Sequence, residues 1–269
     1  MYSNNNKYLK YKKKYLDLKG GVLTLLQINV YVMRHGDRAD DHEATPEVQA
    51  TVDRIEDTPL SPAGLHTALT RSATLLKSNH FFTKIVSSPM LRCVQTADVA
   101  EKVFKTGFVM LNNNIREVWH PKVLKRALSE VRLRTKSELD LHNIKSKLII
   151  DFSPFDAGEE TRGVGGSADR RFRDSITTLA KQAALEGHKE LLIVTHGDAI
   201  GSFVALTHPG HSIYEVNYCG FVGATLEFQI QTESQPAPST GHLPQPSIAD
   251  RWTFIEDLQE NSGVGIMAD

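Results

Sequence analysis

The sequence predicts an α/β fold with a mostly parallel central sheet. Three short apolar runs, over residues 28–33, 81–86 and 191–195, are each followed by polar loops and then by helical patterns. Such alternation is typical of strands in a parallel sheet. The first run leads into His35 and the third into His196. Because ligands bind at the carboxyl ends of the strands in open α/β sheets, we expect the two histidines to converge.

The chain divides into a short leader and one domain. Residues 1–21 are rich in lysine and tyrosine and close with Gly20 and Gly21. We interpret this leader first as a solvated or frayed helix and second as a tether to a docking or anionic surface. Residues 22–269 are predicted to form a single domain, since 40% hydrophobic residues in a chain of 269 supply one substantial core.

Helices are predicted after the first two apolar runs. Ser61 is a favourable N-cap and Pro62 a favourable first helical residue, and the apolar side chains that follow recur at helical spacing. Among them Leu65 and Leu69 are expected to pack in the core. The helix predicted after Pro89 can present backbone amides to a phosphate at its first turn.

The second half of the domain is less regular. A helical pattern from residue 169 to 187 precedes the strand that leads into His196, and residues 222–230 alternate as a half-buried strand does. Residues 120–170 contain a locally basic stretch and are predicted to be an insertion near the active site. Residues 231–249 are predicted to be a flexible loop. Residues 251–258 could add a last strand before a frayed tail.

The charged residues around the histidines suit a phosphate. Arginine presents a planar fork of donors that matches phosphate oxygens. Arg34 and Arg38 flank His35, and Arg92 lies at the start of the helix predicted after Pro89. Imidazole is a nucleophile at neutral pH when one ring nitrogen is free. His35 is therefore the candidate nucleophile, and His196 a further phosphate ligand.

Transfer of a phosphoryl group also needs a proton for the departing alkoxide. Three carboxylates lie in suitable parts of the sequence. Glu117 is our first choice, and Asp37 and Asp198 are the alternatives.

These motifs resemble one known family. Residues 34–36, residues 88–97 and residues 195–197 are similar to the motifs of the histidine phosphatase superfamily, also called phosphoglycerate mutase-like, in its branch 1. The resemblance covers roughly residues 28–230 and implies a three-layer α/β/α sandwich.

The resemblance also assigns roles to the site residues. It implies that His35 is phosphorylated transiently and that Arg34, Arg92 and His196 complete the phosphate pocket. In that family an acidic residue in a short motif after the third strand donates the proton, and Glu117 stands at the matching place.

Within the superfamily the chain is most similar to the phosphatase domain of proteins that also contain ubiquitin-associated and SH3 domains. Residues 34–40 and 88–97 carry this similarity. Phosphoglycerate mutases have a polar Ser or Thr and an Asn shortly after the first motif, where this chain has Arg38 and Asp40. Hydrolysis is therefore favoured over mutase activity.

We expect a metal-independent phosphoric monoester hydrolase that works through a phosphohistidine on His35 and needs no cofactor. The alternatives are a phosphoglycerate mutase-like phosphotransferase and a non-catalytic scaffold with the same fold. The similar subgroup favours a phosphotyrosine protein or an aryl phosphate as substrate, while a nucleotide, a sugar phosphate or another small phosphomonoester stays open. Homodimers are common in that subgroup, so the resemblance also leaves a homodimer open.

Composition excludes several other classes. A formal net charge of −1 gives no general attraction to nucleic acid or to an anionic membrane. Cys93 and Cys219 are the two cysteines, which argues against a disulfide scaffold and for a reducing compartment. The sequence has no Cys-x-x-Cys or His-Glu-x-x-His spacing for a metal, and no apolar run of the ~18 residues that a transmembrane helix needs. A cytoplasmic protein is expected.

Overall fold

A computed structural model describes residues 23–41, 44–151, 158–231, 250–255 and 262–268. The predicted leader lies outside these residues, as do residues 232–249 of the predicted flexible loop. Within the described residues, seven strands form one sheet in the order β4-β3-β2-β5-β1-β7-β8. Five of them run parallel, and β7 runs antiparallel between β1 and β8. The strands are β1 (Leu23–Arg34), β2 (Lys84–Ser87), β3 (Val109–Asn112), β4 (Leu148–Asp151), β5 (Glu190–Thr195), β7 (Phe221–Gln231) and β8 (Arg251–Phe254).

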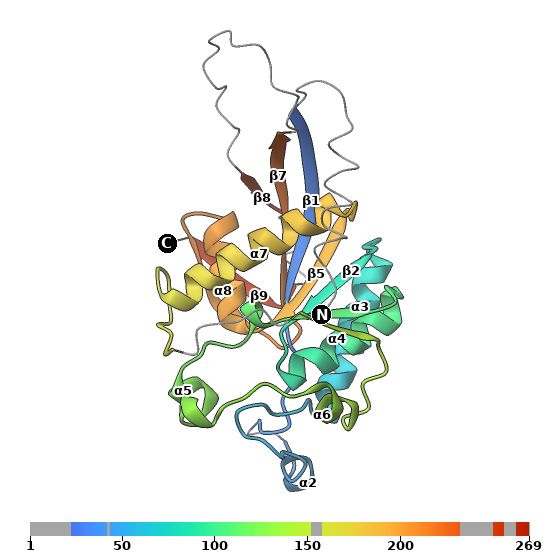
Figure 1. Ribbon diagram of the computed structural model, residues 1–269, viewed down its shortest axis with the longest axis vertical. Coiled ribbons are helices and arrows are strands. Elements are labelled where there is room, and N and C mark those ends of the chain that lie inside the picture. Colours follow the sequence, from blue (N-terminus) through green and yellow to red (C-terminus); the bar gives the residue numbers. More distant parts are fainter. Residues whose placement is uncertain (1–22, 42–43, 152–157, 232–249, 256–261, 269) are drawn as a thin grey trace, which may run out of the picture.

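Helices cover both faces of this sheet (Figure 1). Helices α3 (Pro62–Lys77) and α4 (Leu91–Phe104) pack on one face, and α7 (Ser167–Leu185) and α8 (Gly197–Thr207) pack on the other. The predicted three-layer α/β/α sandwich with a mostly parallel sheet is therefore confirmed. The shorter helices are α2 (Pro46–Gln49), α5 (Pro121–Leu124), α6 (Lys136–Asp140) and the 3₁₀ turns η1 (Asn113–Ile115) and η2 (Leu128–Glu130).

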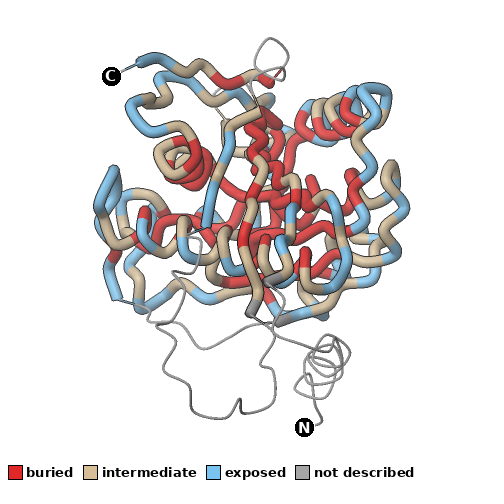
Figure 2. The backbone as a smooth tube through the Cα atoms, turned by 90° about the horizontal axis from the view of Figure 1, so that it is seen from above, coloured by how far each residue is buried: buried red, intermediate tan, exposed pale blue. Residues whose placement is uncertain are grey.

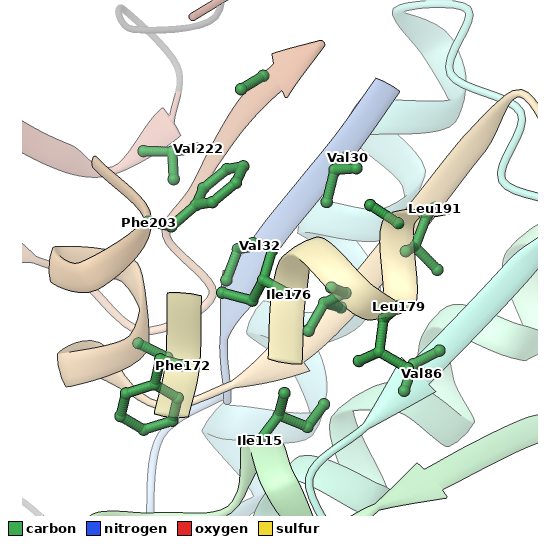
Figure 3. Packing of buried hydrophobic residues seen from close by; sticks show 14 of the residues in the cluster. Val30, Val32, Val86, Ile115, Phe172, Ile176, Leu179, Leu191, Phe203 and Val222 are labelled. Atoms are coloured by element: carbon green, nitrogen blue, oxygen red, sulfur yellow. The ribbon is translucent and has the colours of Figure 1, made fainter. Parts of the chain in front are cut away.

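The core has two halves because successive side chains of a strand point to opposite faces. On β1, Val30 and Val32 join the cluster under α7 and α8, which Figure 3 shows from close by. Tyr31 and Met33 join the cluster under α3 and α4. Figure 2 shows that the buried backbone is concentrated between the helical layers and that the exposed segments lie at the periphery. The central strands are buried on both faces, so their sequences read as continuous apolar runs.

The helix after Ser61 begins as predicted but faces the core differently. Ser61 Oγ accepts a hydrogen bond from the amide of Gly64 at 3.0 Å. A Cβ on Gly64 would lie 2.2 Å from the carbonyl oxygen of Asp37, so this face of α3 is pressed against the loop after β1. Leu65 and Leu69 are turned outward and are 41% and 50% exposed. The prediction that both pack in the core was wrong.

Four strands have no counterpart among the residue ranges that were predicted from the sequence. Two belong to the main sheet, β3 and, at its edge, β4. The other two are β6 (His211–Val216) and β9 (Val264–Ala268), which pair antiparallel in a second small sheet. The predicted strands over residues 222–230 and 251–258 correspond to β7 and β8, with residues 256–258 outside the described part. The frayed tail predicted after them is wrong for residues 264–268, which form β9.

Candidate active site

The structure brings the predicted site residues together at the carboxyl edge of the sheet. His35 follows β1 and His196 follows β5, and these strands are neighbours whose last residues, Arg34 and Thr195, are in register. Strand β2 pairs with β5 on its other side and leads into the loop before Arg92. Strand β3 leads through η1 to Glu117. Four parallel strands thus bring the candidate catalytic side chains to one edge of the sheet, as expected for open α/β sheets.

His35 is almost fully buried, at 3% exposure. Its Nδ1 lies 2.8 Å from the carbonyl oxygen of Gly36. A carbonyl oxygen only accepts, so Nδ1 holds the proton and Nε2 keeps its lone pair. Burial and then the charge of Arg92 lower the pKa of His35 well below its ordinary value. The ring is therefore neutral at neutral pH and has one nitrogen free to act as a nucleophile.

His196 is also buried but has different partners. Its Nδ1 lies 3.0 Å from Oε2 of Glu117, and its Nε2 lies 2.9 Å from Oγ of Ser88. Ser88 Oγ in turn accepts from the amide of Met90 at 3.3 Å, which leaves its own proton for His196 Nε2. The second histidine is thus held on both nitrogens. Burial lowers its pKa, and the neighbouring carboxylate of Glu117 offsets only part of that shift.

Glu117 is the acceptor at the centre of the site. Its Oε2 accepts from Nη2 of Arg92 at 3.0 Å, and its Oε1 accepts from the amide of Val118 at 3.0 Å. Burial alone raises the pKa of this carboxyl. The charge and hydrogen bond of His196 and the charge of Arg92 outweigh burial and hold the pKa well below its usual range. Glu117 is therefore ionised in the free protein.

Arg34 and Arg38 approach the site from the end of β1 and the loop after it. Arg34 Nη1 donates to the carbonyl oxygen of Val216 at 2.5 Å, and its guanidinium lies 4.1 Å from the ring centroid of Tyr218. Arg38 is held by Asp40 in a two-point ion pair. Both arginines are therefore oriented before any ligand binds.

A cleft of about 710 Å³ opens over these residues. Arg34, His35, Arg38 and Glu117 lie on its wall, together with residues of α7, α8 and β6. A second hollow of about 660 Å³ adjoins it, and both include Val123 and Arg162 on their walls. The predicted insertion over residues 120–170 therefore contributes Val123, Arg162 and the start of α7 to the cleft.

The two alternative carboxylates are separated by the structure. Asp198 lies on the cleft wall, where it forms a two-point ion pair with Arg162 at 2.9 Å and 3.0 Å. Asp37, like Arg92 and His196, is not among the described residues that line the cleft, and its carbonyl oxygen accepts from the amide of Ser61 at 2.9 Å. Glu117 both lines the cleft and bonds to Arg92 and His196, so its contacts group it with the histidines.

A buried ion pair supports the helix that carries Arg92. Asp57 Oδ1 accepts from the amide of Leu91 at 2.6 Å, at the first residue of α4. Its Oδ2 accepts from Nε of Arg134 at 2.8 Å, and both side chains are only 2% exposed. Arg134 comes from the region between α5 and α6. This pair ties that region to the helix that positions Arg92.

Sequence reasoning missed several residues that the structure places in the site. Ser88 lies in a recognised motif, but its bond to His196 depends on a strand pairing that no local pattern reveals. Val216 is the last residue of the unpredicted strand β6 and Tyr218 follows that strand, and both contact Arg34. Arg162 lies within residues 120–170, the predicted insertion near the active site, and this was the one available signal.

Two further features bear on the class of protein. Among the residues that the structure describes, no group of three or more His, Cys, Asp or Glu side chains could hold a metal ion. In the same part of the chain, no helix has both the length and the apolar character needed to span a membrane.

Fold and site together define an α/β protein with a cluster of two histidines and several arginines at the carboxyl edge of its sheet. The family model described as histidine phosphatase superfamily (branch 1) matches residues 30–220. This match covers well over half of the chain, and the protein belongs to the histidine phosphatase superfamily, branch 1. A search of curated proteins gave no match.

The chain is similar to several solved structures. The ecdysone phosphate phosphatase of Bombyx mori, solved with tungstate, is 17% identical over 82% of this chain and 98% of its own, with a TM-score of 0.55. A phosphoglycerate mutase from Bacillus anthracis is 16% identical over 74% and 88%, with a TM-score of 0.47. A mycobacterial glucosyl-3-phosphoglycerate phosphatase in complex with VO3 is 15% identical over 85% and 97%, with a TM-score of 0.45.

Proposed function

We propose that the protein is a phosphoric monoester hydrolase that works through a phosphohistidine on His35. The observation that carries this proposal is the bond from His35 Nδ1 to the carbonyl oxygen of Gly36, which leaves Nε2 unprotonated in a neutral ring beside Arg34 and Arg92. A neutral nitrogen nucleophile among fixed cations suits attack on an anionic phosphorus centre.

The reaction proceeds in two steps. His35 Nε2 attacks the phosphorus atom, the bond from phosphorus to the ester oxygen breaks, and the alcohol leaves with a proton. A water molecule then gives a proton to the Glu117 carboxylate and attacks the phosphorus of the phosphohistidine. The bond from phosphorus to His35 Nε2 breaks, which releases inorganic phosphate and restores neutral His35. Arg34, Arg38, Arg92 and His196 bind the phosphoryl oxygens and offset the charge of the transition state. No step requires a metal ion.

Glu117 supplies the proton for the alcohol. In the free protein this carboxylate is ionised because Arg92 and His196 stabilise its charge. A bound phosphate dianion competes for the same two partners and places a like charge beside the carboxylate, which raises its pKa. Glu117 thus gains a proton on substrate binding and gives it to the leaving oxygen. Asp198 stays the alternative acid, since it lies on the same cleft wall.

A mutase-like phosphotransferase is the second candidate. It would use the same pocket but pass the phosphoryl group of His35 to a second hydroxyl. Arg38 and Asp40 stand where mutases have Ser or Thr and Asn, which supports water as the acceptor. A non-catalytic scaffold is the third candidate, and the retention of Arg34, His35, Arg92 and His196 argues against it.

The substrate class is inferred from two similarities to other phosphatases and from no contact in the site itself. Similarity to the phosphatases with ubiquitin-associated and SH3 domains favours a phosphotyrosine protein or an aryl phosphate. The B. mori protein is described as a phosphatase of ecdysone phosphate, a small phosphomonoester.

We infer one catalytic domain over residues 22–269 that acts as a cytoplasmic enzyme, as a monomer or a homodimer, with no nucleic-acid partner.

The experiment is phosphate release from p-nitrophenyl phosphate by the wild type and by His35→Ala, in the presence of a chelator and between pH 5 and 8. Turnover that persists in chelator and disappears in the variant supports the proposal. Equal turnover by both proteins would refute a role for His35. A folded wild type without turnover would move the assignment to the mutase or the scaffold, and transfer to added sugar phosphates would distinguish those two.

A further inference from the structure

Arg38 is held by a series of ion pairs that reaches beyond the motif of residues 34–40. Its Nε donates to Oδ1 of Asp40 at 2.7 Å, and its Nη2 donates to Oδ2 of Asp40 at 2.6 Å. Lys125 Nζ donates to the same Oδ2 at 3.0 Å. Lys125 follows α5, so the series connects the region between η1 and β4 to the loop that carries Arg38.

The exposure of the three side chains suits this arrangement. Arg38 and Asp40 are 22% and 14% exposed, whereas Lys125 is 48% exposed. The pair of Arg38 and Asp40 is thus largely withdrawn from water, where a two-point ion pair fixes a guanidinium well. The pKa of Asp40 is lowered to about 2, because its bonds to Arg38 and Lys125 outweigh its partial burial. The carboxylate is therefore charged at any working pH.

The charge of Lys125 changes the net charge of the group that it forms with Arg38 and Asp40. Asp40 alone would neutralise Arg38 and leave little attraction for a phosphate. With Lys125 the three groups carry a net charge of +1 next to the cleft wall on which Arg38 lies. A positive potential at the mouth of a cleft attracts an anionic ligand and weakens with added salt.

The backbone at Lys125 ends helix α5. Lys125 is the C-cap residue and has φ of 56° in the left-handed region, a conformation in which helices commonly end. Its side chain reaches Asp40 from this turn.

We propose that Asp40 and Lys125 are positioning residues of the phosphate site: Asp40 orients Arg38 toward the cleft, and Lys125 offsets the charge of Asp40 so that Arg38 still attracts the phosphate. The proposal rests on the proposed function for its kinetic meaning. Lys125, from the region between η1 and β4, thereby contributes to phosphate binding by Arg38 in the loop after β1.

The test measures kcat and KM for p-nitrophenyl phosphate at low and high salt. Lys125→Met is expected to raise KM about fivefold at low ionic strength, with little change in kcat and a smaller effect in high salt. Lys125→Arg keeps the charge and is expected to restore KM to within about twofold of the wild type. Asp40→Asn is expected to lower kcat about tenfold without raising KM, because Arg38 loses its orientation while the positive charge grows.

Two matched controls separate this role from general stability. Lys102 is also 48% exposed and forms an ion pair of 2.6 Å with the buried Asp98, away from the cleft wall. Lys105 shares the left-handed backbone, with φ of 56°. Lys102→Met and Lys105→Met are expected to leave kcat and KM within about twofold of the wild type.

Binding of inorganic phosphate, measured by calorimetry, keeps this inference separate from the proposed function. A wild type that binds phosphate without turnover would defeat the hydrolase assignment, while weaker binding by Lys125→Met than by Lys102→Met would still support the inference. Equal phosphate affinity and equal KM in those two variants would overturn it. So would a Lys125→Arg variant as impaired as Lys125→Met, since the charge would then be irrelevant.

Discussion

The ends of β1 and β5 present the same local structure and two different histidines. Each strand is buried, parallel and followed at once by a histidine, and the two ring centroids lie 5.4 Å apart. His35 bonds to a backbone carbonyl and has cations as its charged neighbours, whereas His196 lies between a carboxylate and a hydroxyl. The backbone brings both rings to the same edge of the sheet, and the neighbours decide which ring has a free nitrogen.

Replacement of each histidine by asparagine tests most directly whether the two residues have different roles. His35→Asn removes the nucleophile, so we expect kcat/KM to fall by about 10⁴-fold or more. His196→Asn removes one phosphate ligand, so we expect a smaller loss of about 10²-fold to 10³-fold. Steady-state kinetics with p-nitrophenyl phosphate measures both. Equal losses, or a larger loss for His196, would contradict the assignment of roles.

Arg92 is the residue that both histidine environments share. It lowers the pKa of His35 and binds the carboxylate that bonds to His196. We expect Arg92→Ala to lower kcat/KM about 10²-fold to 10³-fold, and Arg92→Lys to recover only part, because lysine lacks the planar fork. Arg132→Met, at an exposed arginine paired with Glu138, is the control and should change little. A full recovery by lysine would show that charge alone is needed there.

Glu117 distinguishes the second histidine from the first, and its role depends on the leaving group. Glu117→Gln keeps the shape but cannot give up a proton. We expect about a 10²-fold loss in kcat on alkyl phosphates and less than about tenfold on p-nitrophenyl phosphate, whose phenolate leaves without help. Both substrates are measured with the same enzyme samples. If the two losses are equal, Glu117 is not the acid, and Asp198→Asn becomes the variant to compare.

The pH dependence of stability gives the smallest effect. Burial lowers the pKa of both histidines in the folded state, so near and below pH 6.5 the unfolded chain binds more protons than the folded one. Stability should therefore rise with pH between about 5 and 7, by at most about 1.4 kcal/mol per pH unit for each histidine. Urea unfolding of the wild type, His35→Asn and His196→Asn measures the slope. The slope should shrink more in His35→Asn, and an unchanged slope in both would argue against neutral buried rings.

The sequence predicted the central part of this architecture because strong local signals lie there. Residues 28–33 and 191–195 are buried on both faces and read as apolar runs, and the motifs that follow them carry the charges. Glu117 was our first choice of acid, and the resemblance matched it to the motif after the third strand, but neither predicted its bond to His196. Residues 211–216 and 264–268 were missed because they pair with each other across a long separation and have mixed exposure.

Other misses have equally specific causes. Leu65 and Leu69 follow a helical spacing, but the close approach of Gly64 to the loop after β1 decides which face of α3 is buried. Asp40 lies two residues from Arg38, but the sequence could not show that Lys125 bonds to the same carboxylate, because Lys125 lies far along the chain. Contacts between distant segments, and not local propensity, set these features.

In the proposed mechanism His35, and not His196, carries the phosphoryl group. We would mix the enzyme with p-nitrophenyl phosphate, quench the mixture in alkali within the first turnovers, and locate the phosphate on the peptides by mass spectrometry. We expect phosphohistidine at His35 in the wild type and none in His35→Asn. A phosphorylated His196, or steady turnover with no phosphohistidine in the quenched wild type, would contradict it.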